Sequence, residues 1–149
     1  MPNNLIRNVG HHNGRTEVIF YKKRRRYKYT LLEDYLHQTE LHPAQPISMA
    51  FISLDTAGQL IIKKGYAWDG PSGPTIDTDN FMRGSLVHDA LYQLMREKYL
   101  GQEHRKYADR LLRDICSEAG MSKIRDWWVY QAVRLGGASS AKPDVRQAP

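Results

Sequence analysis

The chain is poor in cysteine and has no long hydrophobic run. Its 149 residues include one cysteine, Cys116, so no internal disulfide can form, and such cysteine usage is typical of proteins made in a reducing cytoplasm. No apolar run approaches the ~20 residues that a membrane-spanning helix needs. The polar stretch 1–14 lacks the apolar core of a signal peptide. We therefore expect synthesis in the cytoplasm, with no signal peptide and no transmembrane segment.

The rest of the composition is that of a globular domain. Hydrophobic residues make up 41% of the chain and charged residues 26%, close to the average for globular proteins, and the length suits one hydrophobic core. The polar stretch 1–14 predicts a flexible arm, and the composition of residues 138–149 predicts a flexible tail. Between them we expect a single domain over residues 15–137.

The net charge of +6 is unevenly distributed. Residues 1–64 contain ten Lys/Arg and five Asp/Glu, which gives +5, whereas the remainder contains twelve and eleven, which gives +1. Most of the excess comes from one basic run, made of Lys22, Lys23, Arg24, Arg25, Arg26 and Lys28. Such a run can contact anionic lipid head groups, an acidic protein surface or nucleic acid. It can equally be a solvated strand edge that its charge protects against aggregation.

The N-terminal half has the pattern of a small antiparallel sheet. Residues Thr16–Tyr21 are β-branched and aromatic, and Tyr27–Leu32 can continue that strand or pair with it. The segments Ile47–Leu54 and Gln59–Lys63 flank a short turn that contains Gly58, where a positive φ is inexpensive. These two segments therefore predict a hairpin.

The C-terminal half has helical periodicity. The apolar spacing predicts helices from about Asn80 to Glu97 and from about Gln102 to Glu118, and a third that begins after Ser122 and stops at Gly136. Apolar stripes on the first two helices predict an antiparallel pair. The expected fold class is therefore α+β, with an N-terminal antiparallel sheet, a Gly/Pro/Asp loop and three C-terminal helices.

The stretch Gly65–Tyr92 (GYAWDGPSGPTIDTDNFMRGSLVHDALY) joins the two halves. Its glycines and prolines allow sharp turns and a close approach of backbone to a ligand. The helix that follows contains His88 and Asp89 side by side. Because adjacent helical residues point about 100° apart, we expect no hydrogen bond between these two. We expect His88 to face the partner helix and Asp89 to face the loop.

Antiparallel packing of the first two helices could bring Asp109 to His88. A carboxylate that holds one imidazole nitrogen fixes the tautomer and leaves the other nitrogen free to take a proton from water. Asp89, with Asp69 and loop carbonyls, would offer the oxygen ligands that calcium prefers. A calcium ion there would polarise a substrate carbonyl and stabilise the developing oxyanion. These residue types predict a hydrolytic site.

Other interpretations of the same residues stay open. His88 can be a core histidine with satisfied hydrogen bonds, Asp109 can pair with a neighbouring cation, and Asp69 can form an Asx-turn before Gly70. The adjacent His and Asp can also belong to a metal-dependent phosphohydrolase. That chemistry would need further histidine ligands on helices, and only His104 is near in the sequence.

The C-terminal two thirds of the chain contain a set of motifs, which are DGPSGP, HDALY, the pair Ala108-Asp109, and an end with Tyr130, Ala132, Val133, Arg134 and Gly136. This set resembles the pattern of a family of uncharacterised small proteins of tailed bacteriophages and prophages. The resemblance covers roughly residues 60 to 137. The resemblance implies a phage origin but no settled function. For such a protein we separately expect synthesis in the host cytoplasm and association with the virion, where its partners would be other virion proteins and it could be an assembly subunit.

The same stretch is similar, more distantly, to calcium-dependent secreted phospholipase A2 enzymes, especially bacterial ones. Those enzymes have a glycine-rich calcium loop, an HDxxY helix and an Asp on the following antiparallel helix. The resemblance implies that His88 is the water-activating base, Asp109 its orienting carboxylate and Tyr92 a supporting buried hydroxyl. It also implies a calcium cofactor held by three residues, which are Asp69, Gly70 through its carbonyl, and Asp89.

Two functions follow as expectations. The first is a phage-encoded, calcium-dependent hydrolase of phospholipid acyl esters, whose basic run would bind an anionic membrane surface. The second is a non-catalytic virion protein of the tail or tail tip, which would use the same region as a packing scaffold. Nucleic acid is the less favoured partner.

Overall fold

The computed structural model describes residues 5–12, 15–23, 29–68, 79–118, 120 and 130–135. Several predicted features lie outside these residues. They are most of the basic run (Arg24, Arg25, Arg26 and Lys28), the loop residues Asp69 and Gly70, the first part of the third predicted helix, and the tail 138–149.

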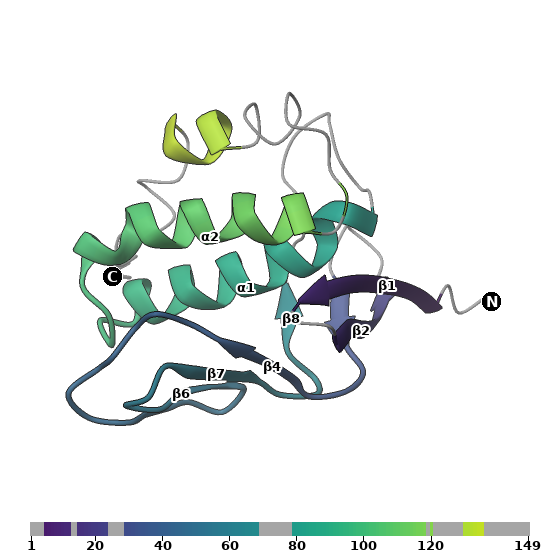
Figure 1. The fold of residues 1–149 in the computed structure, drawn as a ribbon. Helices are drawn as coiled ribbons and strands as arrows, with labels where there is room; N and C mark the ends of the chain where they lie inside the picture. The colour runs from purple at the N-terminus through teal and green to yellow at the C-terminus, as the bar shows by residue number, and fades with distance from the viewer. Residues whose placement is uncertain are drawn as a thin grey trace, which may run out of the picture.

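The strands of the described residues form two four-stranded antiparallel sheets (Figure 1). The first sheet has the order β1-β2-β3-β8, with β1 (Leu5–His12), β2 (Arg15–Lys23), β3 (Tyr29–Leu31) and β8 (Ala67–Trp68). The second has the order β4-β7-β6-β5, with β4 (Tyr35–Gln38), β5 (Ile47–Ser48), β6 (Ile52–Leu54) and β7 (Gln59–Ile62). The chain thus crosses from the first sheet to the second after β3 and returns at β8, immediately before the Gly/Pro/Asp loop.

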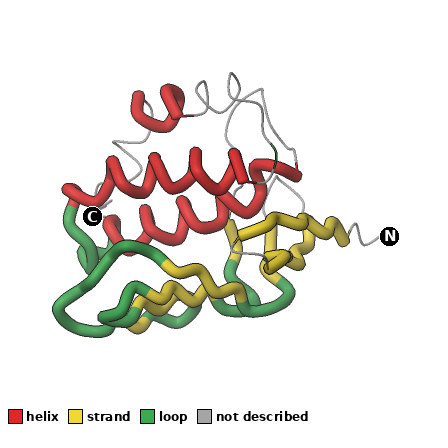
Figure 2. Tube along the Cα trace, viewed as in Figure 1, coloured by secondary structure: helices red, strands yellow, loops and turns green. Residues whose placement is uncertain are grey.

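Two long helices pack side by side above the second sheet, with β1 and β2 of the first sheet near one end of the pair (Figure 1). They are α1 (Asp79–Arg96) and α2 (Arg105–Glu118), joined through the short 3-10 helix η1 (Gln102–His104). Figures 1 and 2 show α1 between the second sheet and α2, with the helical residues 130–135 on the other side of α2. The predicted α+β class and the predicted antiparallel helix pair are confirmed. Among the described helices, none is long and apolar enough to cross a lipid bilayer.

The position of α1 explains why it is buried nearly all round. Met82, Leu86, Leu91 and Leu94 are at most 1% exposed, and they share one core with buried side chains of both sheets. A helix that is covered on opposite sides needs apolar residues around its whole circumference. Each such side chain contributes about 1.5–3 kcal/mol when it leaves water. Packing on two sides therefore makes α1 the rigid centre on which a site can be built.

The two helices lie close together at Gly84. A Cβ atom at this position would lie 2.8 Å from Leu112 Cδ1 and 2.9 Å from Cys116 Sγ, which is closer than side chains normally tolerate. Leu112 and Cys116 pack with Phe81 of α1 in a small second apolar cluster, against which Val133 of the C-terminal helical segment also lies. Glycine thus allows the crossing of α1 and α2 to be tight.

The N-terminus differs from the prediction. The expected flexible arm 1–14 contains strand β1, which pairs with β2 from Leu5 opposite Lys22 to His12 opposite Arg15. Two residues separate the paired strands, and their sequence, Asn-Gly, is the pair that favours two-residue hairpins. The Asn-Gly pair indicated a hairpin, but the prediction of a flexible arm gave more weight to the polar composition of the segment.

The predicted hairpin around Gly58 is present, with one change. Gly58 has φ of 92°, and the Asp55 side chain accepts hydrogen bonds from backbone N–H groups inside the turn between β6 and β7. The predicted single strand Ile47–Leu54 is instead divided into β5 and β6. The backbone N–H of Met49 donates to the carbonyl of Ile52 at 2.8 Å, so a tight turn folds this segment back on itself.

Candidate functional site

The candidate site lies at the seam between α1 and α2. His88 Nε2 is 2.8 Å from Asp109 Oδ1, and the Tyr92 hydroxyl donates to the same oxygen at 2.5 Å. His88 and Tyr92 are four residues apart, so they lie on one face of α1, and their ring centroids are 4.1 Å apart. The structure therefore brings His88 and Asp109 together across the helix pair, as their spacing predicted.

Asp109 is the most enclosed member of the network. Its side chain is 0% exposed, and that of His88 is 10% exposed. A buried carboxylate is tolerated only when donors satisfy it. Asp109 has donors on both oxygens, because His88 and Tyr92 contact Oδ1 while Arg134 Nη1 donates to Oδ2 at 3.0 Å.

This environment sets the charges of the network. Burial by itself would raise the pKa of Asp109, but the hydrogen bonds from His88, Tyr92 and Arg134 outweigh burial and lower that pKa. Burial would likewise lower the pKa of His88, but the two carboxylates of Asp109 and Asp89 outweigh it and raise that pKa. The pKa of Tyr92 is raised by burial and by Asp109. Asp109 is thus a stable carboxylate, and Tyr92 stays protonated as its donor.

The second ring nitrogen of His88 faces a different carboxylate. Nδ1 lies 3.7 Å from Asp89 Oδ1, too far for a direct hydrogen bond but near enough for electrostatic attraction. Asp89 therefore lies near the imidazole, although adjacent residues of a helix point about 100° apart. The Asp89 side chain is 32% exposed, so water can reach this side of the ring.

The Gly/Pro/Asp loop starts close to this side of α1. Trp68 Nε1 donates to Ser85 Oγ at 3.1 Å, and Ser85 lies one helical turn before Asp89. The last described residue before the loop is thus held about one turn from Asp89. The other two predicted calcium ligands, Asp69 and Gly70, lie outside the described residues.

Histidines and carboxylates elsewhere do not extend the site. Within the part of the chain that the structure describes, no group of three or more His, Cys, Asp or Glu side chains could hold a metal ion. His104, the additional histidine considered for a phosphohydrolase, lies in η1, where its Nε2 is 3.6 Å from Glu103.

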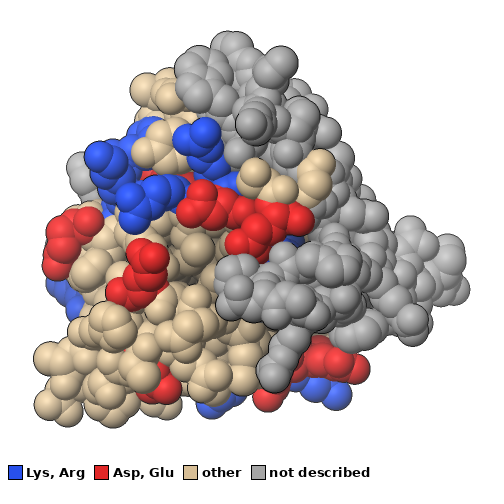
Figure 3. Space-filling model, viewed as in Figure 1, with Lys and Arg blue, Asp and Glu red and all other residues tan. Residues whose placement is uncertain are grey.

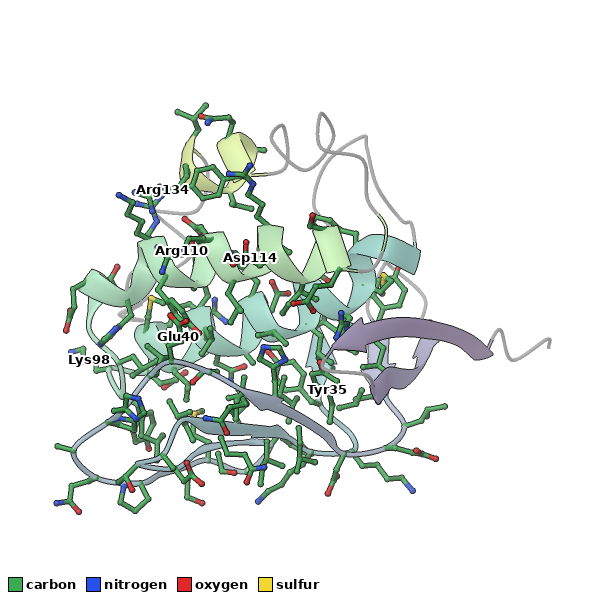
Figure 4. The ribbon with its side chains drawn as sticks, viewed as in Figure 1. Tyr35, Glu40, Lys98, Arg110, Asp114 and Arg134 are labelled. Atoms are coloured by element: carbon green, nitrogen blue, oxygen red, sulfur yellow. The ribbon has the colours of Figure 1, made fainter. Side chains whose placement is uncertain are left out.

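Arg134 is the member of the network for which sequence reasoning gave no role. It comes from the helical residues 130–135, and its backbone carbonyl accepts a hydrogen bond from Arg105 Nη2 at 2.5 Å. Arg105 also lies near the Tyr92 hydroxyl and opposes the rise of the Tyr92 pKa. Figure 4 shows Arg134 between the C-terminal segment and α2, and in Figure 3 Lys and Arg side chains gather over this region beside Asp and Glu side chains. The sequence signal was the motif with Tyr130, Ala132, Val133 and Arg134.

Fold and site together define a class: a small α+β protein with a buried His–Asp–Tyr–Arg hydrogen-bond network across an antiparallel helix pair. The chain belongs to the family described as "Protein of unknown function (DUF1353)", whose model matches residues 47–133, more than half of the sequence. The match includes His88, Tyr92 and Asp109 and ends one residue before Arg134. No curated protein and no solved structure matches the chain.

Proposed function

We propose that this protein is a calcium-dependent hydrolase of phospholipid acyl esters with a phospholipase A2-like site, and that it is encoded by a bacteriophage and carried in the virion. The observation that carries the proposed activity is the unequal environment of the two imidazole nitrogens of His88. Nε2 is held by the fully buried Asp109, whereas Nδ1 lies on the side of the partly exposed Asp89.

The network is suited to general-base catalysis. A neutral His88 that donates from Nε2 to Asp109 has its lone pair on Nδ1, where it can accept a proton from water as that water attacks an ester carbonyl. Asp109 remains charged because its pKa is lowered, so it stabilises the imidazolium that forms. Tyr92 donates to the same carboxylate oxygen and limits its movement. The proton then passes to the leaving alcohol, and a fatty acid is released.

The donor chemistry beside Nδ1 is compatible with calcium. Asp89 supplies a hard carboxylate oxygen. The hydrogen bond from Trp68 to Ser85 holds Trp68 about one helical turn from Asp89, and Asp69 is the next residue in the sequence. Asp89, Asp69 and the Gly70 carbonyl would hold the ion. Bound calcium would polarise the ester carbonyl and stabilise negative charge on its oxygen.

The proposed substrate class and origin rest on the sequence. The basic run that begins at Lys22 would favour an anionic membrane surface, and the combination of motifs resembles proteins of tailed phages. Low calcium in the host cytoplasm would leave a weak calcium site empty during synthesis. Hydrolysis would then begin only when the protein reaches the cell envelope or the exterior.

Fatty-acid release from anionic liposomes, with calcium and with a calcium chelator, tests the proposed activity. We expect calcium-dependent release by the wild-type protein and a loss of about 10²–10⁴-fold in His88→Ala, the range for a missing general base. His104→Ala is the matched control, because it removes a histidine outside the network. Equal background release by the wild type and His88→Ala would end the proposal.

The alternative is a non-catalytic virion protein in which the same network only holds α1, α2 and residues 130–135 together. Its support is a set of large apolar side chains on the surface, namely Leu36 (49% exposed), Phe51 (45%), Tyr99 (51%) and Leu135 (86%). Exposed apolar residues of this size can form contacts between subunits. Mass spectrometry of purified virions tests this alternative, which fails if the protein is absent from the particles.

A further inference from the structure

Arg134 joins the His88–Asp109 pair to a third structural element. The helical residues 130–135 lie on α2, where Arg113 is 5.7 Å from the centre of the Tyr130 ring and Val133 packs on the small apolar cluster. These contacts place the Arg134 backbone, and its side chain then reaches Asp109 Oδ2. The side chain of Arg134 is 31% exposed, whereas Asp109 is fully buried.

The donors of Asp109 are divided between its two oxygens. His88 and Tyr92, both from α1, contact Oδ1, while Arg134 contacts Oδ2. A carboxylate held at one oxygen only can still rotate about its Cβ–Cγ bond. Donors on both oxygens, from different elements, determine the plane of the group and therefore the direction in which Oδ1 presents its lone pairs.

We propose that Arg134 is a positioning residue for the His88–Asp109 pair, which it serves by holding the plane of the Asp109 carboxylate so that Oδ1 stays on His88 Nε2. The catalytic consequence of this role rests on the hydrolase proposed above, but the geometric consequence does not. Arg134 acts through Asp109 rather than on substrate, because it contacts the carboxylate oxygen that His88 does not use.

The hydrogen bond from Arg105 strengthens this interpretation. Arg105 donates to the Arg134 carbonyl and also lies near the Tyr92 hydroxyl. Arg105 therefore links the backbone of Arg134 to the side of the carboxylate where Tyr92 lies. Because the donors of Asp109 are connected in this way, the position of one depends on the others, and the loss of Arg134 should change the hydrogen bond at His88.

The competing explanation is that Arg134 only attaches residues 130–135 to α2. Two substitutions separate the explanations. Arg134→Met keeps the apolar stem of the side chain but removes every donor, whereas Arg113→Met loosens the same segment by removing the contact with Tyr130 and leaves Asp109 with its donors. Arg134→Lys keeps the positive charge but loses the planar fork. Thermal melts identify which variants are folded.

Two measurements are made on the four proteins at one fixed pH. The first is the kcat and KM of fatty-acid release from anionic liposomes. The second is the ¹⁵N-histidine NMR resonance of the His88 Nε2–H group, assigned by its disappearance in His88→Gln. The resonance reports the hydrogen bond to Asp109 and does not require hydrolysis.

We expect kcat of Arg134→Met to fall about 10- to 100-fold with KM within about twofold, the loss typical of misplaced supporting groups. The His88 Nε2–H resonance of Arg134→Met should shift or broaden. In Arg134→Lys both kcat and the resonance should change in the same direction by less, and in Arg113→Met both should match the wild type. The proposal is overturned if Arg134→Met and Arg113→Met behave alike.

The two proposals can fail separately. If none of these four proteins hydrolyses phospholipid, the hydrolase proposal fails, and the His88 Nε2–H resonance alone decides the role of Arg134. A resonance that changes in Arg134→Met but not in Arg113→Met supports the role, and an unchanged resonance refutes it. If Arg134→Met does not fold, the folded Arg134→Lys protein decides by the same criterion.

Discussion

Replacing Asp109 by asparagine should destabilise the fold, because the side chain is buried and has donors on both oxygens. Asparagine has nearly the same shape but no charge, and one carboxylate oxygen becomes an NH₂ group. If the remaining oxygen stays with His88 and Tyr92, those two hydrogen bonds become neutral. The NH₂ group then faces Arg134, so that a donor meets a donor.

The magnitude follows from these three interactions. Hydrogen bonds to charged groups are about twice as strong as neutral ones, and they contribute about 1.5–3 kcal/mol each, so weakening two of them costs about 1–3 kcal/mol in total. The lost bond to Arg134 adds about 1 kcal/mol, reduced because that side chain is 31% exposed and water can replace the carboxylate. The sum is about 2–4 kcal/mol, a large part of the 5–15 kcal/mol typical of a domain.

Urea unfolding followed by far-UV circular dichroism measures this loss, and calorimetry should show a fall in Tm of about 5–15 °C. Asp114→Asn is the matched control, because Asp114 is on the same helix and exposed, and it should change the free energy of unfolding by less than about 0.5 kcal/mol. Equal stabilities of Asp109→Asn and Asp114→Asn would refute the reasoning, because the buried network would then contribute nothing measurable.

Three further predictions concern the same helix pair. The raised pKa of His88 stabilises the fold below its ordinary value of 6.5, and this contribution is lost as pH rises through the folded value. The lowered pKa of Asp109 stabilises the fold above 3.8, and this contribution is lost as pH falls through the folded value. Urea titrations of the wild type and His88→Gln should therefore show the largest difference in free energy of unfolding between pH 3.8 and pH 6.5. A difference that stays constant with pH would contradict a charged His88–Asp109 pair. Tyr92→Phe should cost about 1–3 kcal/mol, because Asp109 Oδ1 loses a donor, and an unchanged urea midpoint would contradict this. Gly84→Val should cost about 1–3 kcal/mol in calorimetry through overpacking of the α1–α2 crossing, whereas Gly101→Val, next to a flexible exposed Glu side chain, should cost less.

Local patterns in the sequence were sufficient for most of the secondary structure. The apolar spacing predicted α1 and α2 to within a few residues, because amphipathic periodicity records which face of a helix is buried. The turn at Gly58 was equally readable, since a positive φ is expensive for other residues. The meeting of His88 and Asp109 also followed from local patterns, because two apolar stripes joined by a short connection can pack in few ways.

Contacts that other segments make with this helix pair and with each other were not readable from the sequence. The sequence predicted one apolar stripe on α1, but α1 is buried nearly all round because a sheet covers one side and α2 the other. The polar residues 5–12 form β1 only because β2 supplies a complementary edge.

The sequence by itself determined the two long helices, the turn at Gly58 and the pair of residues at the centre of the candidate site. Only the tertiary structure decided that Asp89 lies near His88 Nδ1 and that Arg134 contacts the second oxygen of Asp109. The physical reason is the range of the forces involved. Helices and turns reflect the preferences of neighbouring residues, whereas the geometry of a buried carboxylate depends on donors that come from two other parts of the chain.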